Sequence, residues 1–195
     1  MSKRVVIIDG HPDASGTHFG HALAAAYAQA AEAAGHEVRS IPVGALDFPM
    51  LRHKADWEHG AVPVSIQEAQ RAIGWAEHLV IVYPLWLGSM PACLKAFMEQ
   101  VFRPGFAIGR SGGIGRWKKR LTGKSARVIV TMGMPALVYR WYFRAHSLKS
   151  LERNVLQFCG IGPIRDTVIG MVETPNPRKR ERWLERMRLL GREAQ

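Results

Sequence analysis

Short apolar runs alternate along the chain with longer stretches of helical pattern. The apolar runs are rich in β-branched residues, which is typical of strands buried on both faces. Strands are predicted at residues 4–9, 36–41, 78–83, 126–131 and 164–171. Helices are predicted at residues 19–34, 66–76, 90–102, 147–158 and 178–192. This alternation predicts an α/β fold with a parallel sheet and helices on both faces.

Five strands that alternate with five helices suit the doubly wound strand order 2-1-3-4-5. In such sheets ligands bind at the carboxyl ends of the strands, near the point where the strand order reverses. We therefore expect the chemistry in the loops after strands one, three and four, at residues 10–18, 84–90 and 132–146. Pro and Gly interrupt residues 42–65 and 103–124, which predicts long surface connections with at most short helical pieces in the first.

The length of 195 residues suits one domain, residues 1–195. No apolar run approaches the length of a membrane span, and Asp9 ends the N-terminal run too early for a signal peptide. We therefore expect a cytoplasmic protein. Cys93 and Cys159 are far apart and form no CxxC motif, so we expect ordinary buried or half-buried thiols.

The formal net charge is +11, and much of the excess lies in residues 110–124 and 178–192. A basic surface attracts nucleic acid, acidic lipids or phosphorylated cofactors. No RNA-binding aromatic signature or helix-turn-helix accompanies it, so no nucleic-acid partner is expected. A solvated basic face and attraction of NADPH phosphates or of an acidic partner are both compatible with the charge.

The first loop, residues 10–18, is rich in glycine, histidine and hydroxyl residues and opens a helix. Free amides and the helix dipole favour an anion there, and His11, Ser15 and Thr17 add donors. The loop matches neither a Walker A nor a GxGxxG motif. Ser15 or Thr17 acting only as a helix cap is the alternative. His11, His18 and His21 have no carboxylate at a convincing spacing, so no metal is expected.

The second loop follows the most apolar strand and contains Pro-Leu-Trp-Leu-Gly at residues 84–88. A flat heteroaromatic ring needs this combination of apolar surface and bare backbone at a strand tip. Packing of Trp86 in the core is the alternative.

Residues 83–97, followed by Val101-Phe102 and Gly105-Phe106-Ala107, resemble the signature of the flavodoxin-like NAD(P)H:quinone reductases. That family includes the DT-diaphorase type and the ancillary oxidoreductases of glutathione-gated potassium efflux systems. The first loop is similar to theirs in its His-Pro pair and in Thr17, six positions after His11. The resemblance extends from Arg4 to about Met171.

The resemblance implies a flavodoxin-like fold and a flavin cofactor, FMN or FAD, held by residues of all three loops. Met134 stands where relatives have a second glycine, and Gly20 where many have asparagine. The resemblance implies that the phosphate end is held by His11, Thr17, His18 and Phe19. Along the face of the isoalloxazine ring it implies Pro84, Leu85, Trp86 and Leu87. At the opposite ring edge it implies Thr131, Met132, Gly133 and Met134.

Two further residues, Tyr139 and His146, fall where the relatives carry a Tyr and a His beside the flavin. A phenol hydrogen-bonded to an imidazole can stabilise negative charge on a reduced flavin and help to protonate substrate. Packing of Tyr139 and a capping role for His146 are the alternatives.

The resemblance implies a ping-pong hydride relay from NAD(P)H to a quinone-like acceptor. It also implies a homodimer, with Trp117, Tyr142 and Phe143 as candidate interface residues. A regulatory subunit of a membrane partner, such as a potassium efflux system, is the alternative function. A yellow purified protein that reduces quinones with NADPH would favour the enzyme, and a colourless, inert protein would favour the regulatory subunit.

Overall fold

The structure is a computed structural model that describes residues 2–110 and 117–195. At its centre lies a five-stranded parallel sheet in the order β2-β1-β3-β6-β7, which confirms the predicted order 2-1-3-4-5. The strands are β1 (Arg4–Asp9), β2 (Glu37–Pro42), β3 (His78–Pro84), β6 (Ser125–Thr131) and β7 (Ile164–Ile169).

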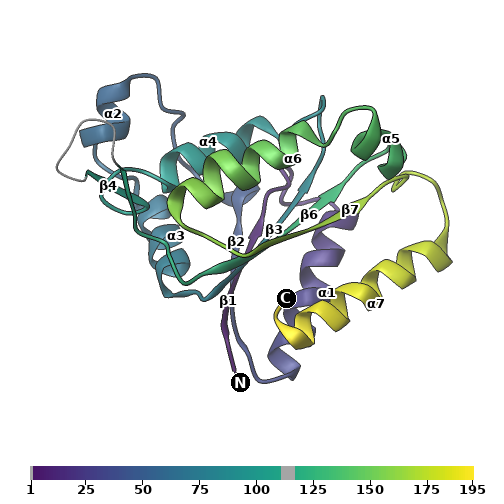
Figure 1. Ribbon diagram of the computed structural model, residues 1–195. Coiled ribbons are helices and arrows are strands. Elements are labelled where there is room, and N and C mark those ends of the chain that lie inside the picture. Colours follow the sequence, from purple (N-terminus) through teal and green to yellow (C-terminus); the bar gives the residue numbers. More distant parts are fainter. Residues whose placement is uncertain (1, 111–116) are drawn as a thin grey trace.

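Helices cover both faces of the sheet (Figure 1). One face carries α1 (Phe19–Ala33) and α7 (Pro177–Glu193), which pack against each other. The other face carries α3 (Val64–Trp75), α4 (Ala92–Val101) and α6 (His146–Ser150). Helix α6 continues into a π-helical segment, η2 (Leu151–Gln157), so the predicted helix at residues 147–158 changes its geometry along its length.

Alternation along the strands divides the core between these two faces. Val5 and Ile7 of β1 pack with α1 and α7, whereas Val6 and Ile8 pack with the helices of the other face. Successive side chains of a strand point to opposite faces, so a strand must be apolar throughout to serve both layers. This explains the uninterrupted apolar runs in the sequence.

The long connections contain more regular structure than predicted. Residues 42–65 include η1 (Val43–Ala45) and α2 (Lys54–His59), which agrees with short helical pieces. Residues 103–124 include an antiparallel pair, β4 (Ile108–Arg110) and β5 (Trp117–Lys119), which was not predicted. Residues 111–116 of the predicted basic loop lie outside the described residues. The third loop contains α5 (Ala136–Trp141), also not predicted.

Within residues 2–110 and 117–195, no helix combines the length and the apolar character needed to cross a membrane.

Candidate functional site

The three predicted loops meet at the carboxyl edge of the sheet. The first two loops follow β1 and β3, which are neighbours in the sheet. Leu85 N–H in the second loop donates to the carbonyl oxygen of Thr131, where the third loop begins (2.7 Å). The rings of His11 and Trp86 meet edge to face with their centroids 6.0 Å apart. Segments far apart in the sequence therefore form one surface where the strand order reverses.

A carboxylate lies at the centre of the first loop. Asp13 Oδ1 accepts hydrogen bonds from the N–H groups of Ser15 (2.9 Å) and Gly16 (3.2 Å) and from the Ser15 hydroxyl (2.8 Å). Asp13 Oδ2 lies 2.8 Å from His18 Nε2. The contact with His18 and those with Ser15 hold the pKa of Asp13 well below its usual value, so the carboxylate is ionised at neutral pH.

The imidazole of His11 is buried within the first loop. It stacks on the ring of His18, with centroids 3.7 Å apart, and meets the ring of His21 edge to face at 5.1 Å. Burial, reinforced by the neighbouring His18, lowers the pKa of His11, which favours its neutral form. His11 Nδ1 lies 3.2 Å from Asp13 N and 3.1 Å from the Asp13 carbonyl oxygen, so the neutral ring either accepts from the N–H or donates to the carbonyl.

His21 links the first loop to β1. Its Nδ1 pairs with the Asp9 carboxylate, and its Nε2 lies 2.9 Å from the carbonyl oxygen of Asp13. Partial burial lowers the pKa of His21, but the contacts with Asp9 and Asp13 outweigh it, and the net shift is upward. The sequence pattern suggests His21 only as a possible metal ligand and indicates no role for either aspartate, although both aspartates lie beside the predicted loop residues.

Neither hydroxyl residue of the first loop caps α1. The residue before the helix is His18, which makes no side-chain capping bond, and the Ser15 hydroxyl is bound to Asp13. Thr17 is exposed, and among the described residues its hydroxyl has no hydrogen-bond partner. Phe19 begins the helix beneath the guanidinium of Arg180, 5.2 Å from the ring. Helix capping therefore does not explain these hydroxyls, and Thr17 is free to contact a ligand.

Trp86 stands half-exposed just beyond the tip of β3. Its backbone N–H and carbonyl pair with Ser89 at 2.8 and 2.9 Å, and this tight turn places Leu87 and Gly88 in the left-handed region, with φ of 47° and 79°. The Trp86 side chain is 50% exposed and Leu87 is fully exposed, whereas Pro84 and Leu85 are half-buried. The alternative that Trp86 packs in the core is therefore wrong.

The third loop presents mainly backbone to the site. Thr131 and Met132 are buried, and Met134 is half-buried against the core beneath the loop. Gly133 is exposed, but a Cβ atom there would lie 2.9 Å from Glu173 Oε1. The Glu173 carboxylate, which follows β7, thus lies over Gly133. No sequence pattern after that strand marks Glu173 as a site residue.

The structure does not form the expected phenol–imidazole pair. Tyr139 is 2% exposed, and its hydroxyl contacts Ser147 Oγ (2.8 Å) and accepts from Leu148 N–H (3.2 Å). His146 is exposed at the start of α6, and its N–H donates to the carbonyl oxygen of Phe143 (3.2 Å). The buried phenol of Tyr139 is directed to the first turn of α6. Its hydrogen bonds are with Ser147 and Leu148, next to His146, and not with the His146 imidazole.

Both cysteines are free thiols. Cys93 is half-buried and Cys159 is buried, as predicted. Burial raises the pKa of Cys159 to about 12. Within the described part of the chain, no group of three or more His, Cys, Asp or Glu side chains is arranged to hold a metal ion.

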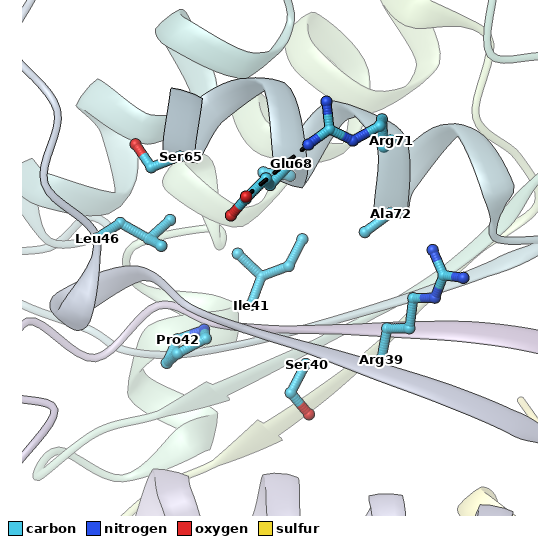
Figure 2. A pocket seen from close by; sticks show the side chains of 10 residues that line it. Arg39, Ser40, Ile41, Pro42, Leu46, Ser65, Glu68, Arg71 and Ala72 are labelled. Carbon is cyan, nitrogen blue, oxygen red and sulfur yellow. Dashed lines mark ion pairs between the residues drawn. The ribbon is translucent and has the colours of Figure 1, made fainter. Parts of the chain in front are cut away.

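A separate hollow of about 540 Å³ lies between β2 and α3 (Figure 2). Its rim carries an ion pair between Glu68 and Arg71 (3.8 Å). Arg39, also on the rim, places its guanidinium 4.0 Å from the centroid of the Trp75 ring. The lining comes from β2, α3 and the connection between them, so this hollow is distinct from the three-loop surface.

The chain belongs to the family with the flavodoxin-like fold, whose model matches residues 3–190. Its sequence is 28% identical over 188 residues to an uncharacterized NAD(P)H oxidoreductase of Haemophilus influenzae, an alignment that covers 92% of this chain and 90% of that protein. This match extends the likeness well beyond the motifs of the second loop.

Solved structures with a similar fold include the following two. The NAD(P)H:quinone oxidoreductase from Methanothermobacter marburgensis superposes with a TM-score of 0.85 over all of both chains, at 24% identity. An FMN-dependent NADH-azoreductase from Bacillus anthracis, in complex with FMN, has a TM-score of 0.75 and 16% identity, and the match covers 100% of this chain and 99% of that one. At these identities the likeness establishes the fold alone.

Proposed function

We propose that the protein is a flavin-dependent NAD(P)H:quinone-type oxidoreductase that works by a ping-pong hydride relay. The observation that carries this proposal is the meeting of three loops at the carboxyl edge of the sheet. There an exposed indole ring, Trp86, lies beside a loop whose amides hold an oxyanion. A flat, phosphorylated redox ring needs these two features side by side. The named activities of the Haemophilus and Methanothermobacter proteins support the same reaction class.

The donor set of the first loop fits a phosphate. Two of its amides and one hydroxyl already satisfy the Asp13 carboxylate, and the Thr17 hydroxyl is free among the described residues. FMN is the first cofactor to test, because it is bound by the similarly folded azoreductase. We propose that the phosphate end, ring face and opposite ring edge are held by His11, Thr17, His18 and Phe19, by Pro84, Leu85, Trp86 and Leu87, and by Thr131, Met132, Gly133 and Met134.

A bound flavin supplies the capacity to accept a hydride from NAD(P)H and to return it to an acceptor. The protein residues orient this cofactor and stabilise charge. We assign His146, exposed at the start of α6, to stabilising negative charge and moving a proton. Tyr139 acts as a positioning residue, because its hydroxyl holds Leu148 N–H two residues beyond His146. NAD(P)H and the quinone-like acceptor would use the same space in turn, which gives ping-pong kinetics.

The experiment is FMN titration of the purified protein, followed by NADPH-dependent reduction of a quinone. We expect saturable binding, a flavin absorbance spectrum and parallel double-reciprocal plots. Trp86→Ala should weaken FMN binding by roughly tenfold, because an aromatic stacking partner is lost. Trp75→Ala is the matched control, since Trp75 lies near Arg4 at the opposite edge of the sheet.

Two results would contradict the proposal. A protein that takes up neither FMN nor FAD and reduces no quinone is not this enzyme, and it would favour a regulatory subunit. Equal FMN affinity in wild type and Trp86→Ala, with Trp75→Ala also unchanged, would remove Trp86 from the site.

A further inference from the structure

The backbone donors of the first loop already hold an anion that is part of the chain. Asp13 Oδ1 accepts hydrogen bonds from the Ser15 and Gly16 amides and from the Ser15 hydroxyl, and Asp13 Oδ2 pairs with His18 Nε2. A phosphate bound in this loop, just before α1, would compete for the same amides, because main-chain N–H groups are the donors that hold phosphates at such loops. The carboxylate and a phosphate cannot both accept these hydrogen bonds.

The Asp13 side chain can leave this position without disturbing the core. It is about half-exposed, with a relative accessibility of 49%, and its partner His18 is 38% exposed. His18 also retains its stacking contact with His11, which does not depend on Asp13. Rotation of one exposed side chain would therefore free two amides, a hydroxyl and an imidazole together.

We propose that Asp13 is an internal competitor for the cofactor phosphate, a residue that occupies the anion position in the cofactor-free chain and is displaced when a phosphorylated flavin binds. This inference rests on the proposed function and names the residue that limits the affinity of its site. The competition involves the phosphate only, so Asp13 discriminates between flavins with and without that group.

The test compares wild type, Asp13→Asn and Asp13→Ala in binding titrations with FMN and with riboflavin, which has no phosphate. Asn keeps the size and one acceptor oxygen but removes the charge, and Ala removes the acceptor as well. We expect the Kd for FMN to fall by roughly 10- to 100-fold in Asp13→Ala, because the phosphate no longer displaces a charge-assisted set of hydrogen bonds. The Kd of Asp13→Asn for FMN should lie between those of wild type and Asp13→Ala. The Kd for riboflavin should be the same in all three proteins.

Asp56→Asn is the matched control, since it removes one exposed aspartate charge from α2, far along the chain from the first loop. It separates local competition from a general change in net charge, and its FMN affinity should equal that of wild type. Thermal unfolding in inorganic phosphate is the second readout. Phosphate should raise the Tm of Asp13→Ala more than that of wild type, without any flavin present.

Weaker or unchanged FMN binding in both Asp13 variants would overturn the inference, because Asp13 would then organise the loop for the phosphate or take no part. Failure of the proposed function looks different: no flavin binds to any of the proteins. In that case the phosphate measurement decides, since a larger Tm shift in Asp13→Ala supports competition at an anion site and an equal shift refutes it.

Discussion

His78 is a buried imidazole at the start of β3, at the edge of the sheet opposite the three loops. Its Nδ1 lies 2.8 Å from Ser125 Oγ, and the side chain is almost completely enclosed. Burial, reinforced by the charges of Lys3, Arg127 and Arg165, lowers the pKa of His78 to about 4. The folded protein therefore holds this imidazole neutral in mildly acidic solution.

This shift predicts a loss of stability in acid. In the unfolded chain His78 takes up a proton near its ordinary pKa of 6.5. Between pH 6.5 and about 4 the unfolded state therefore binds more protons than the folded state, and the free energy of unfolding decreases as the pH is lowered. We expect His78 to contribute a loss of about 3 kcal/mol across that window. Urea unfolding of wild type and His78→Leu at pH 7 and pH 4.5 measures it, and curves that fall in parallel would contradict the assignment.

Tyr139 and His146 are expected to respond differently to substitution. Tyr139→Phe removes the acceptor of Leu148 N–H and should lower the free energy of unfolding by about 1–2 kcal/mol. His146→Ala should leave stability unchanged, because the side chain is exposed, and should lower kcat. Urea unfolding and steady-state kinetics of the flavin-loaded variants provide the two readouts. A stable His146→Ala protein with normal kcat at all pH values would remove His146 from the mechanism.

At the scale of elements, α1 and α7 cross at their closest point beside Gly191. A Cβ atom on Gly191 would lie 2.3 Å from the carbonyl oxygen of Tyr27, a backbone atom that cannot turn away. Gly191→Ala should therefore lower the free energy of unfolding by about 1–3 kcal/mol. Glu193→Ala, exposed on the same helix, is the control and should change stability little. Equal stability of the two variants would mean that the helices can separate without cost.

The elements that the sequence predicted well are those whose pattern is long enough to identify. Strands β1, β3 and β6 were found from their apolar runs, whereas β2 (EVRSIP) and β7 (IRDTVI) carry polar residues and were identified between the predicted helices. Parallel topology then dictated which loops meet. Helix α5 has six residues and strands β4 and β5 have three each, too few to display a period. Pro91 precedes α4 and does not belong to its first turn, so that helix begins two residues later than predicted.

Within the site, the residues that meet could be predicted, but their hydrogen bonds could not. The roles of Asp13 and Glu173 depend on side-chain directions in turns, which no periodicity encodes. The same holds for Tyr139, whose hydroxyl turned to Ser147 and Leu148 and not to His146. The sheet topology determines which loops lie side by side, whereas the conformation of each loop determines which side chains form hydrogen bonds.

At the scale of the whole molecule, exposed apolar side chains gather on α5 and the turn after it. Leu137, Trp141 and Tyr142 are 69, 81 and 80% exposed, and Phe143 is 47% exposed. Exposed apolar side chains gathered in this way often mark an interface. Trp117, the third residue named from the sequence, lies elsewhere, on β5 against Trp57 (6.5 Å).

We expect this α5 surface to form a homodimer interface next to the three loops. Light scattering should give twice the mass of one chain for wild type and the mass of one chain for Tyr142→Glu. Met50→Glu changes another exposed apolar residue, 64% accessible, and should stay dimeric. A wild-type protein with the mass of one chain at micromolar concentration would refute the interface. The single domain over residues 1–195, the cytoplasmic location and a membrane-protein partner stay predictions.

The pairing of α1 with α7 has a consequence for biosynthesis. A ribosome delivers residues 4–42 early, so β1, α1 and β2 emerge long before residues 177–193 exist. Until then Leu23 and Tyr27 have no covering helix on that side, although the opposite layer can already assemble. The emergence of α7 from the ribosome is thus the step at which this half of the nascent protein can close.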